Sequence, residues 1–354
     1  MDERVLKSVT ICLSILTVVI CISLNFFPEL HAQAVLEEEK FNSITAVVDA
    51  YGETFNPEDI VEEIDESSNL WIELPEDVKE SDVLIENSYV TQTLFIKMKT
   101  AEADYFNKYK MQGSCDHIAN LSYYNQAEYG VIAVGLDQIY EVEINYSQNG
   151  VGIDFINPHD IYDKIVVIDA GHGGDEYPGA VKNGISEKEI DLAIVQAFKE
   201  YVESKTDEDT SIGFYYTRLD DSAPTLEQRV QMANLLDADL FISVHNNSSK
   251  SGRFTSTNGT QVLYSESDTA EYSSERFAKI CLDSVVEQLG SRRIGLLKGD
   301  DIYIIRNSEV PVALIEVGFM TNKEELEKLT SADYQELAAK GIYDAVLAAF
   351  EDGF

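Results

Sequence analysis

The chain has few cysteines and few basic residues, and each shortage excludes a class of protein. Four cysteines occur among 354 residues, and two of them, Cys12 and Cys21, fall in an apolar stretch near the N-terminus. Cys115 and Cys281 lie far apart along the chain, so we expect two free, mostly buried thiols rather than a disulfide framework. The 64 acidic residues outnumber the 26 basic ones, giving a formal net charge of −38. This charge argues against nucleic acid or anionic lipid as a partner.

Histidines are also few, and their positions are informative. Of the five in the chain, only His172 and His245 fall within residues 161–354. Each follows an apolar run, residues 165–168 and 239–244, of the kind that forms buried parallel strands. Ligands in open α/β sheets gather outside the carboxyl ends of the strands. We therefore expect both imidazoles at one edge of a sheet, although a single histidine is more often structural.

A glutamate is predicted to join them from the start of a helix. Ser186 has the character of a helix N-cap, and Glu189 three residues later completes a capping box. Glu187 would then occupy the first helical position. The Gly/Pro/Asn-rich loop after His172 is long enough to fold the imidazole and the carboxylate together.

These residues suit a metal ion. Two imidazoles and one carboxylate are typical donors for zinc and leave a fourth position for water. The sequence therefore predicts one Zn²⁺ per chain, held by His172, Glu187 and His245. Glu316, which ends the apolar run at residues 312–315, is the candidate general acid and base; on its own residue type it could equally form a buried salt bridge.

Six motifs occur in one order from about residue 165 to the C-terminus: DAGHGG, ISEKEIDLAI, TRLDD, EQRVQMAN, DLFISVHNNS and VALIEVGFMTN. Together they resemble the zinc-dependent N-acetylmuramoyl-L-alanine amidases with a type 3 catalytic domain. The resemblance implies a phosphorylase/hydrolase-like fold, peptidoglycan as the substrate, and hydrolysis of the amide bond between N-acetylmuramic acid and L-alanine of the stem peptide. It also implies that Glu316 is the catalytic residue.

The chain departs from the family pattern at several positions, none of them a predicted ligand. Ala170 stands where proline is usual, Asn246 replaces a small residue, and Arg293 stands where glycine is common. Arg229 matches a family arginine, for which we expect a structural salt bridge. Arg306 also matches one and could meet a substrate carboxylate.

Two alternative functions stay open at this point. The first is a zinc carboxypeptidase or endopeptidase acting on wall peptides, against which the GHGG and EVGF motifs weigh. The second is an inactive wall-binding scaffold. The intact set of site residues argues against it, because an inactive homologue tends to lose its metal ligands first; these residues are His172, Glu187, His245 and Glu316.

The N-terminus, residues 1–34, predicts export. Residues 8–27 are apolar and about long enough to span a bilayer, and residues 32–34 read Ala-Gln-Ala, which resembles a cleavage site. A cleaved signal peptide and an uncleaved anchor are both consistent with this pattern. Either places the rest of the chain outside the cytoplasm, at the cell wall or extracellular face, with membrane contact only through this apolar helix. The sequence gives no prediction of oligomeric state.

Residues 35–160 are expected to form an acidic linker followed by a small β-rich domain. Alternating segments predict strands at residues 71–74, 89–98, 130–136, 139–146 and 151–156. The family resemblance implies that such a domain could bind the wall, while a plain spacer is equally consistent. Tyr123, Tyr124 and Tyr129 could stack on sugars or simply pack.

Residues 161–354 alternate between apolar runs and helical patterns, which predicts an α/β fold with a mostly parallel sheet covered by helices on both faces. We expect strands at residues 165–168, 212–217, 240–244, 260–264, 302–305 and 312–317, and helices at residues 186–204, 226–236 and 273–289 and from residue 333 onward.

Overall fold

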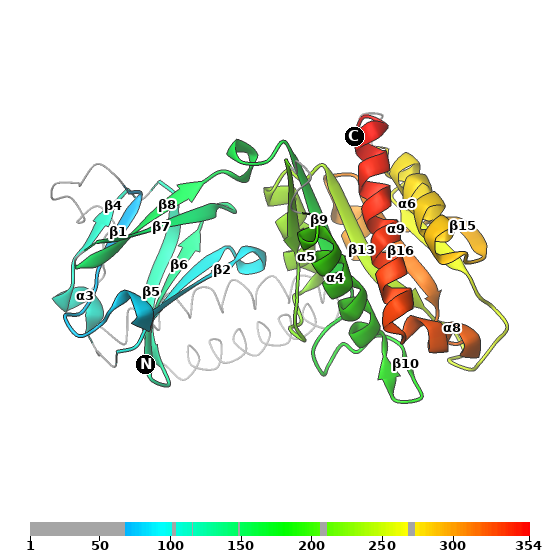
Figure 1. Ribbon diagram of the computed structural model, residues 1–354, viewed down its shortest axis with the longest axis horizontal. Coiled ribbons are helices and arrows are strands. Elements are labelled where there is room, and N and C mark those ends of the chain that lie inside the picture. Colours follow the sequence, from blue (N-terminus) through cyan, green and yellow to red (C-terminus); the bar gives the residue numbers. More distant parts are fainter. Residues whose placement is uncertain (1–67, 101–103, 115, 148, 206–210, 268–272) are drawn as a thin grey trace, which may run out of the picture. The chain divides into compact units, whose positions relative to one another are not determined.

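The computed structural model describes residues 68–100, 104–114, 116–147, 149–205, 211–267 and 273–354 (Figure 1). The predicted N-terminal apolar segment, the acidic linker up to residue 67 and Cys115 lie outside these ranges. Within them, no helix combines the length and the apolar character needed to cross a membrane. Cys281 is free and buried, as predicted.

The strands before residue 157 form two four-stranded antiparallel sheets, ordered β4-β1-β8-β7 and β2-β3-β6-β5. Both sheets contribute to one core, because Ile72 and Ile153 of the first pack in the same buried cluster as Ile96 and Val134 of the second. This is the arrangement of a β-sandwich. The strands are β1 (Leu70–Glu73), β2 (Val83–Ser88), β3 (Thr93–Met98), β4 (Met111–Gly113), β5 (Ile118–Gln126), β6 (Tyr129–Leu136), β7 (Glu141–Ser147) and β8 (Gly150–Ile156).

Alternation in the sequence located β1, β3, β6, β7 and β8, but not β2, β4 or β5. The tyrosines of this region differ in exposure. Tyr123 is buried and stacks on Tyr105, with ring centroids 5.2 Å apart, whereas Tyr124 is exposed. Tyr123 is therefore a packing residue, and Tyr124 remains available for contact with a ligand.

The C-terminal part is built on a six-stranded sheet of order β12-β9-β13-β16-β14-β15. Four of its five strand pairings are parallel, and β14 runs antiparallel to β16. The prediction of an α/β fold with a mostly parallel sheet is confirmed. The strands are β9 (Lys164–Ala170), β12 (Ile212–Tyr216), β13 (Leu240–Asn247), β14 (Thr260–Tyr264), β15 (Arg293–Lys298) and β16 (Val312–Phe319).

Helices cover both faces of this sheet, because its central strands are apolar on both sides. In β9, Val166 and Ile168 pack in one cluster with α4, α6 and α9, whereas Ile165 and Val167 pack in another with α5 and α7. Figure 1 shows α4, α9 and α6 side by side across one face. The helices are α4 (Glu187–Glu203), α5 (Leu226–Leu235), α6 (Ser274–Leu289), α7 (Tyr303–Asn307), α8 (Lys323–Leu329) and α9 (Ala332–Glu351).

One predicted strand is wrong. Residues 302–305 were expected to be extended, but the structure has the short helix α7 there. A run of four apolar residues has no readable period, and the helix buries Ile304 and Ile305 against the α5 side of the sheet. The sequence also gave no sign of β15 or α8.

The register of the sheet brings the predicted site residues to one edge. His245 on β13 lies opposite Glu316 on β16, and Ala170 at the end of β9 lies opposite Val244. Because these three neighbouring strands are parallel, the segments that follow or end them meet at their shared carboxyl edge.

Candidate metal centre

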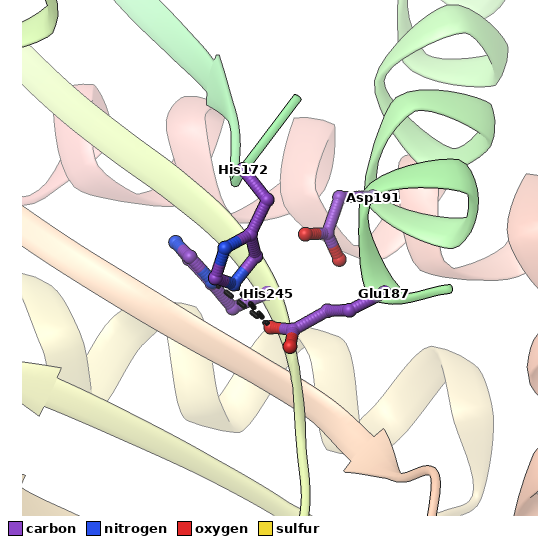
Figure 2. A group of neighbouring side chains, drawn as sticks. All are labelled: His172, Glu187, Asp191 and His245. Carbon is purple, nitrogen blue, oxygen red and sulfur yellow. Dashed lines mark hydrogen bonds and ion pairs between the residues drawn. The ribbon is translucent and has the colours of Figure 1, made fainter. Parts of the chain in front are cut away.

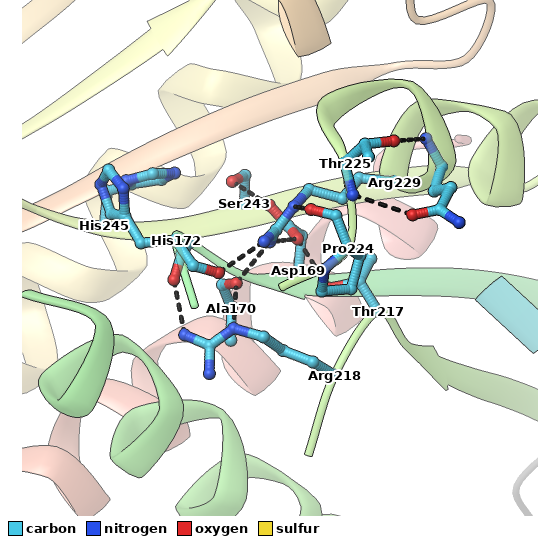
Figure 3. Close-up of polar contacts among 12 residues, drawn as sticks. Asp169, Ala170, His172, Thr217, Arg218, Pro224, Thr225, Arg229, Ser243 and His245 are labelled. Atoms are coloured by element: carbon cyan, nitrogen blue, oxygen red, sulfur yellow. Dashed lines mark hydrogen bonds and ion pairs between the residues drawn. The ribbon is translucent and has the colours of Figure 1, made fainter. Parts of the chain in front are cut away.

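His172 lies in a turn that follows β9, and its backbone is strained. Its φ of 58° is in the left-handed region, which residues other than glycine seldom occupy. Two buried arginines hold the chain there: Arg229 donates to the carbonyl of His172, and Arg218 donates through Nε to the carbonyl of Ala170 at 2.9 Å. Figure 3 shows both guanidinium groups at this turn. Contacts of this kind are what fixes a strained residue in place.

Arg229 is held in place by a buried ion pair with Asp169, which also accepts two hydrogen bonds from hydroxyl groups. Its Nη1 lies 2.6 Å from Asp169 Oδ1, while Thr217 and Ser243 each donate a hydroxyl to the same carboxylate at 2.6 Å (Figure 3). Burial alone would raise the pKa of Asp169, but the Arg229 charge and the two hydroxyl groups outweigh it and hold the pKa below its usual value. This confirms the structural salt bridge expected for Arg229.

Arg218 makes further contacts that the sequence did not reveal. Its Nη2 donates to the carbonyls of Gly171 and of Lys188, the latter at 3.0 Å in the first turn of α4. One guanidinium therefore links the His172 turn to the start of the helix that carries Glu187. The TRLDD motif marked this residue only as part of a family pattern.

The three predicted ligands converge. Glu187 Oε1 lies 3.1 Å from His172 Nε2 and 3.1 Å from His245 Nδ1 (Figure 2). The two imidazole rings are nearly perpendicular, with centroids 4.9 Å apart. Together with Asp191 these side chains form a group whose ligand atoms all lie within 4.8 Å of one another.

Both carboxylate oxygens of Glu187 accept hydrogen bonds from backbone N–H groups. Its Oε2 accepts a hydrogen bond from the backbone N–H of Ala180 at 2.8 Å, and its Oε1 accepts one from that of Asn246 at 3.2 Å. Burial raises its pKa, but the bonds to His172 and His245 outweigh burial and hold the pKa far below its usual range. The carboxylate is therefore ionised, as a metal ligand must be.

Two glycines make this close packing possible. A Cβ at Gly171 would lie 2.4 Å from the His245 ring, and a Cβ at Gly179 would lie 2.7 Å from both Glu187 and the His172 ring. Any larger residue at either position would push a predicted ligand out of place.

Glu316 stands beside this group without belonging to it. It pairs in register with His245, and its Oε2 is buried with no hydrogen-bond partner among the described residues. Burial, followed by the negative charge of Glu187, raises its pKa to about 8. A carboxyl group in this state can hold or release a proton near neutral pH.

Asp191 belongs to the group although the sequence reasoning missed it. It lies four residues after Glu187 on α4, a spacing that places both on one helix face. It is fully buried, and burial together with the Glu187 charge raises its pKa well above the usual value. The Glu-x-x-x-Asp spacing after the N-cap was the available signal.

Among the residues that the structure describes, no hydrogen bond or ion pair links Arg306 to this group. It is exposed on α7, and its Nη1 donates to the carbonyls of Asp300 and Asp301 at 3.3 and 3.4 Å. Its contact with a substrate carboxylate stays a prediction.

The residues present fit a divalent cation. Within the described ranges, no lysine or arginine forms an ion pair with Glu187, Asp191 or Glu316. Two imidazole nitrogens and an ionised carboxylate converge where positive charge is missing, which is the chemistry of a metal site.

We predict that Glu316 makes the metal-free protein less stable as the pH rises. Its pKa of about 8 in the folded state lies above the 4.5 of an ordinary glutamate, so its contribution to stability is fully present below about pH 4.5 and is lost as the pH rises toward 8. With a chelator present, Glu316→Gln should therefore be more stable than the wild type at pH 8.5, by roughly 4 kcal/mol. The difference should shrink toward pH 5. Denaturant unfolding at several pH values measures it, and a difference that does not change with pH would contradict the burial argument.

Comparison with known proteins gives the family. Residues 166–348 match the family model described as N-acetylmuramoyl-L-alanine amidase. The uncharacterized protein YqiI of Bacillus subtilis (strain 168) is 40% identical over 183 residues, which are 52% of this chain and 83% of that protein. N-acetylmuramoyl-L-alanine amidase LytC of the same organism is 33% identical over 53% of this chain and 36% of its own length. The solved catalytic domain of the amidase CwlV from Bacillus (Paenibacillus) polymyxa var. colistinus is 32% identical over 53% of this chain and 98% of that domain, with a TM-score of 0.47.

The family model spans just over half of the chain, and it begins inside β9 and includes every residue of the metal group. The chain therefore belongs to the N-acetylmuramoyl-L-alanine amidase family.

Proposed function

We propose that this protein hydrolyses peptidoglycan at the amide bond between N-acetylmuramic acid and L-alanine of the stem peptide, using one zinc ion held by His172, Glu187 and His245. The observation that carries the proposal is the convergence of these three side chains beside Glu316, in a chain of this family. The family match favours an amidase over the peptidase and scaffold alternatives.

The donor set supports zinc as the metal. Two imidazoles and one carboxylate, with no thiolate, are characteristic of catalytic rather than structural zinc sites. When bound in such a site, zinc lowers the pKa of a water molecule toward about 7 and polarises the scissile carbonyl. The residues of this chain fix the donors: the backbone N–H groups of Ala180 and Asn246 hold the Glu187 carboxylate, and Arg229 holds the backbone of His172.

Glu316 supplies the proton transfer in this proposal. Its Oε2, which has no hydrogen-bond partner among the described residues, lies at the carboxyl edge of the sheet beside His245. Its raised pKa suits a group that must both accept and donate a proton. It takes the proton of the attacking water and delivers it to the amine nitrogen of L-alanine as the amide bond breaks.

The reaction is tested by its products. Purified peptidoglycan digested with the protein should release intact stem peptides, because cleavage is at the lactyl amide, and new free L-alanine amino termini should appear. Mass spectrometry and amino-terminal labelling detect both. Trimmed peptides would instead support the peptidase alternative, new reducing sugars would indicate a glycosidase, and an intact wall would support the scaffold.

The two glutamates should respond differently to substitution. Glu316→Gln keeps the shape but cannot accept a proton, so turnover should fall by about 10²- to 10⁴-fold while zinc content stays nearly unchanged. Glu187→Gln removes a charged ligand, so zinc affinity should fall and added zinc should partly restore activity. Zinc content and turnover are measured on both variants in parallel. If Glu316→Gln loses the metal while Glu187→Gln retains it, the two roles are reversed.

The localisation is also a proposal. The apolar run at residues 8–27 exports the protein, either as a signal peptide cleaved after Ala34 or as an anchor. Because the net charge of −38 is repelled by an anionic wall, binding there needs specific contacts. The β-rich domain, with exposed Tyr124, is the candidate surface.

Export is tested by locating the protein and its N-terminus. We expect it in the membrane or extracellular fraction, and amino-terminal sequencing there distinguishes the cleaved form from the anchored one. Full-length protein found free in the cytoplasm would contradict both forms.

A further inference from the structure

The candidate metal centre contains more carboxyl groups than the positively charged groups around it can pair with. Three carboxyl groups gather there, from Glu187, Asp191 and Glu316. Among the described residues, only the imidazoles of His172 and His245 form ion pairs with any of them, and both pair with Glu187. Asp191 and Glu316 are left without an ion-pair partner in that part of the chain.

Asp191 is the more deeply buried of these two. Its side chain is 0% exposed. Its Oδ1 accepts a hydrogen bond from Asn246 Nδ2 at 2.7 Å, while its Oδ2 has no hydrogen-bond partner within the described residues. A buried carboxyl oxygen without a partner is costly, so this oxygen is available for a cation.

The position of Asp191 directs it at the metal group. It is one helical turn beyond Glu187 on the same face of α4, and its ligand atom lies within 4.8 Å of those of His172, Glu187 and His245. Figure 2 shows its carboxylate pointing from α4 toward the other three side chains. Asn246, which follows His245 directly, donates to one oxygen and leaves the other without a hydrogen-bond partner among the described residues.

We infer that Asp191 is a fourth protein ligand, which donates a carboxylate oxygen to the metal held by His172, Glu187 and His245. This inference rests on the proposed metal-dependent function. Zinc in catalytic sites accepts up to five ligands, so a fourth protein donor leaves a position for water. The added negative charge increases metal affinity and gives the buried oxygen its missing partner.

The test is the zinc affinity of Asp191→Asn, measured on the full chain by competition with a chromophoric chelator. The substitution keeps the size and an oxygen that can accept from Asn246, but removes the charge. We expect the dissociation constant for zinc to rise at least about 10-fold. The metal-free variant should unfold no more easily than the wild type, because it loses a buried unpaired acid.

Asp175→Asn is the matched control. It removes the same charge from the loop after His172, at a fully exposed side chain, and should bind zinc like the wild type. Cobalt(II) substituted for zinc reports the ligands directly, since its visible absorption depends on their number. The band should change in Asp191→Asn and stay unchanged in Asp175→Asn. Asp191→Ala, which removes both oxygens, repeats the test without an amide that could bind metal.

The outcomes separate the inference from the proposed function. Weaker zinc binding and an altered cobalt band in both Asp191 variants support the fourth ligand. Wild-type affinity in those variants, or weaker binding with an unchanged cobalt band, overturns it and leaves the three-ligand site intact. If the wild type itself binds no zinc, the proposed metal site fails and the inference fails with it.

Discussion

The buried ion pair between Asp169 and Arg229 is the interaction on which the site depends. Both side chains are almost fully buried, so each needs the other, and breaking such a pair by removing one partner costs about 3–5 kcal/mol. The pair also has a geometric consequence, because Arg229 reaches past Asp169 to the carbonyl of His172. The Asp169–Arg229 pair thereby helps to hold His172 in a left-handed conformation that is unfavourable for residues other than glycine.

Arg218 also holds backbone segments of the site in place. Its donors reach the end of β9 and the first turn of α4, so the strand that presents His172 and the helix that presents Glu187 cannot move independently. Glu187 then receives hydrogen bonds from Ala180 and Asn246 on opposite sides. A ligand set held by such supporting contacts needs little rearrangement to bind a metal, which is how outer contacts increase affinity.

Much of this site was readable from the sequence, because strand ends and helix starts have local signals. His172 and His245 follow long apolar runs, and the capping box at Ser186 and Glu189 located the start of α4; the structure has the Glu189 carboxylate accepting from the Ser186 N–H at 3.0 Å. Those signals depend on neighbours in the chain, so they survive without knowledge of the tertiary structure.

The parts that were missed depend on contacts between distant segments. The pairing of His245 with Glu316 requires β13 and β16 to be neighbours, which no local pattern states. Asp191 was identifiable as lying on the Glu187 face of the helix, but its burial and its bond to Asn246 exist only once α4 packs on β13. The strand predicted at residues 302–305 was wrong for the same reason, because packing against α5 decided between helix and strand.

The four carboxyl groups at this edge of the sheet have different pKa values because their surroundings differ. Asp169 receives a guanidinium and two hydroxyl groups and is locked as an anion. Glu187 is held ionised by two imidazoles, whereas Glu316 and Asp191 each have one buried oxygen without a hydrogen-bond partner among the described residues and have raised pKa values. In the metal-free protein these pKa values are pushed apart, so Asp169 and Glu187 are anions while Glu316 has the raised pKa that the proposed proton transfer needs. The cost of burying the last two acids is borne by the folded chain, and it is reduced when a cation enters, so the same arrangement that destabilises the metal-free protein favours metal binding.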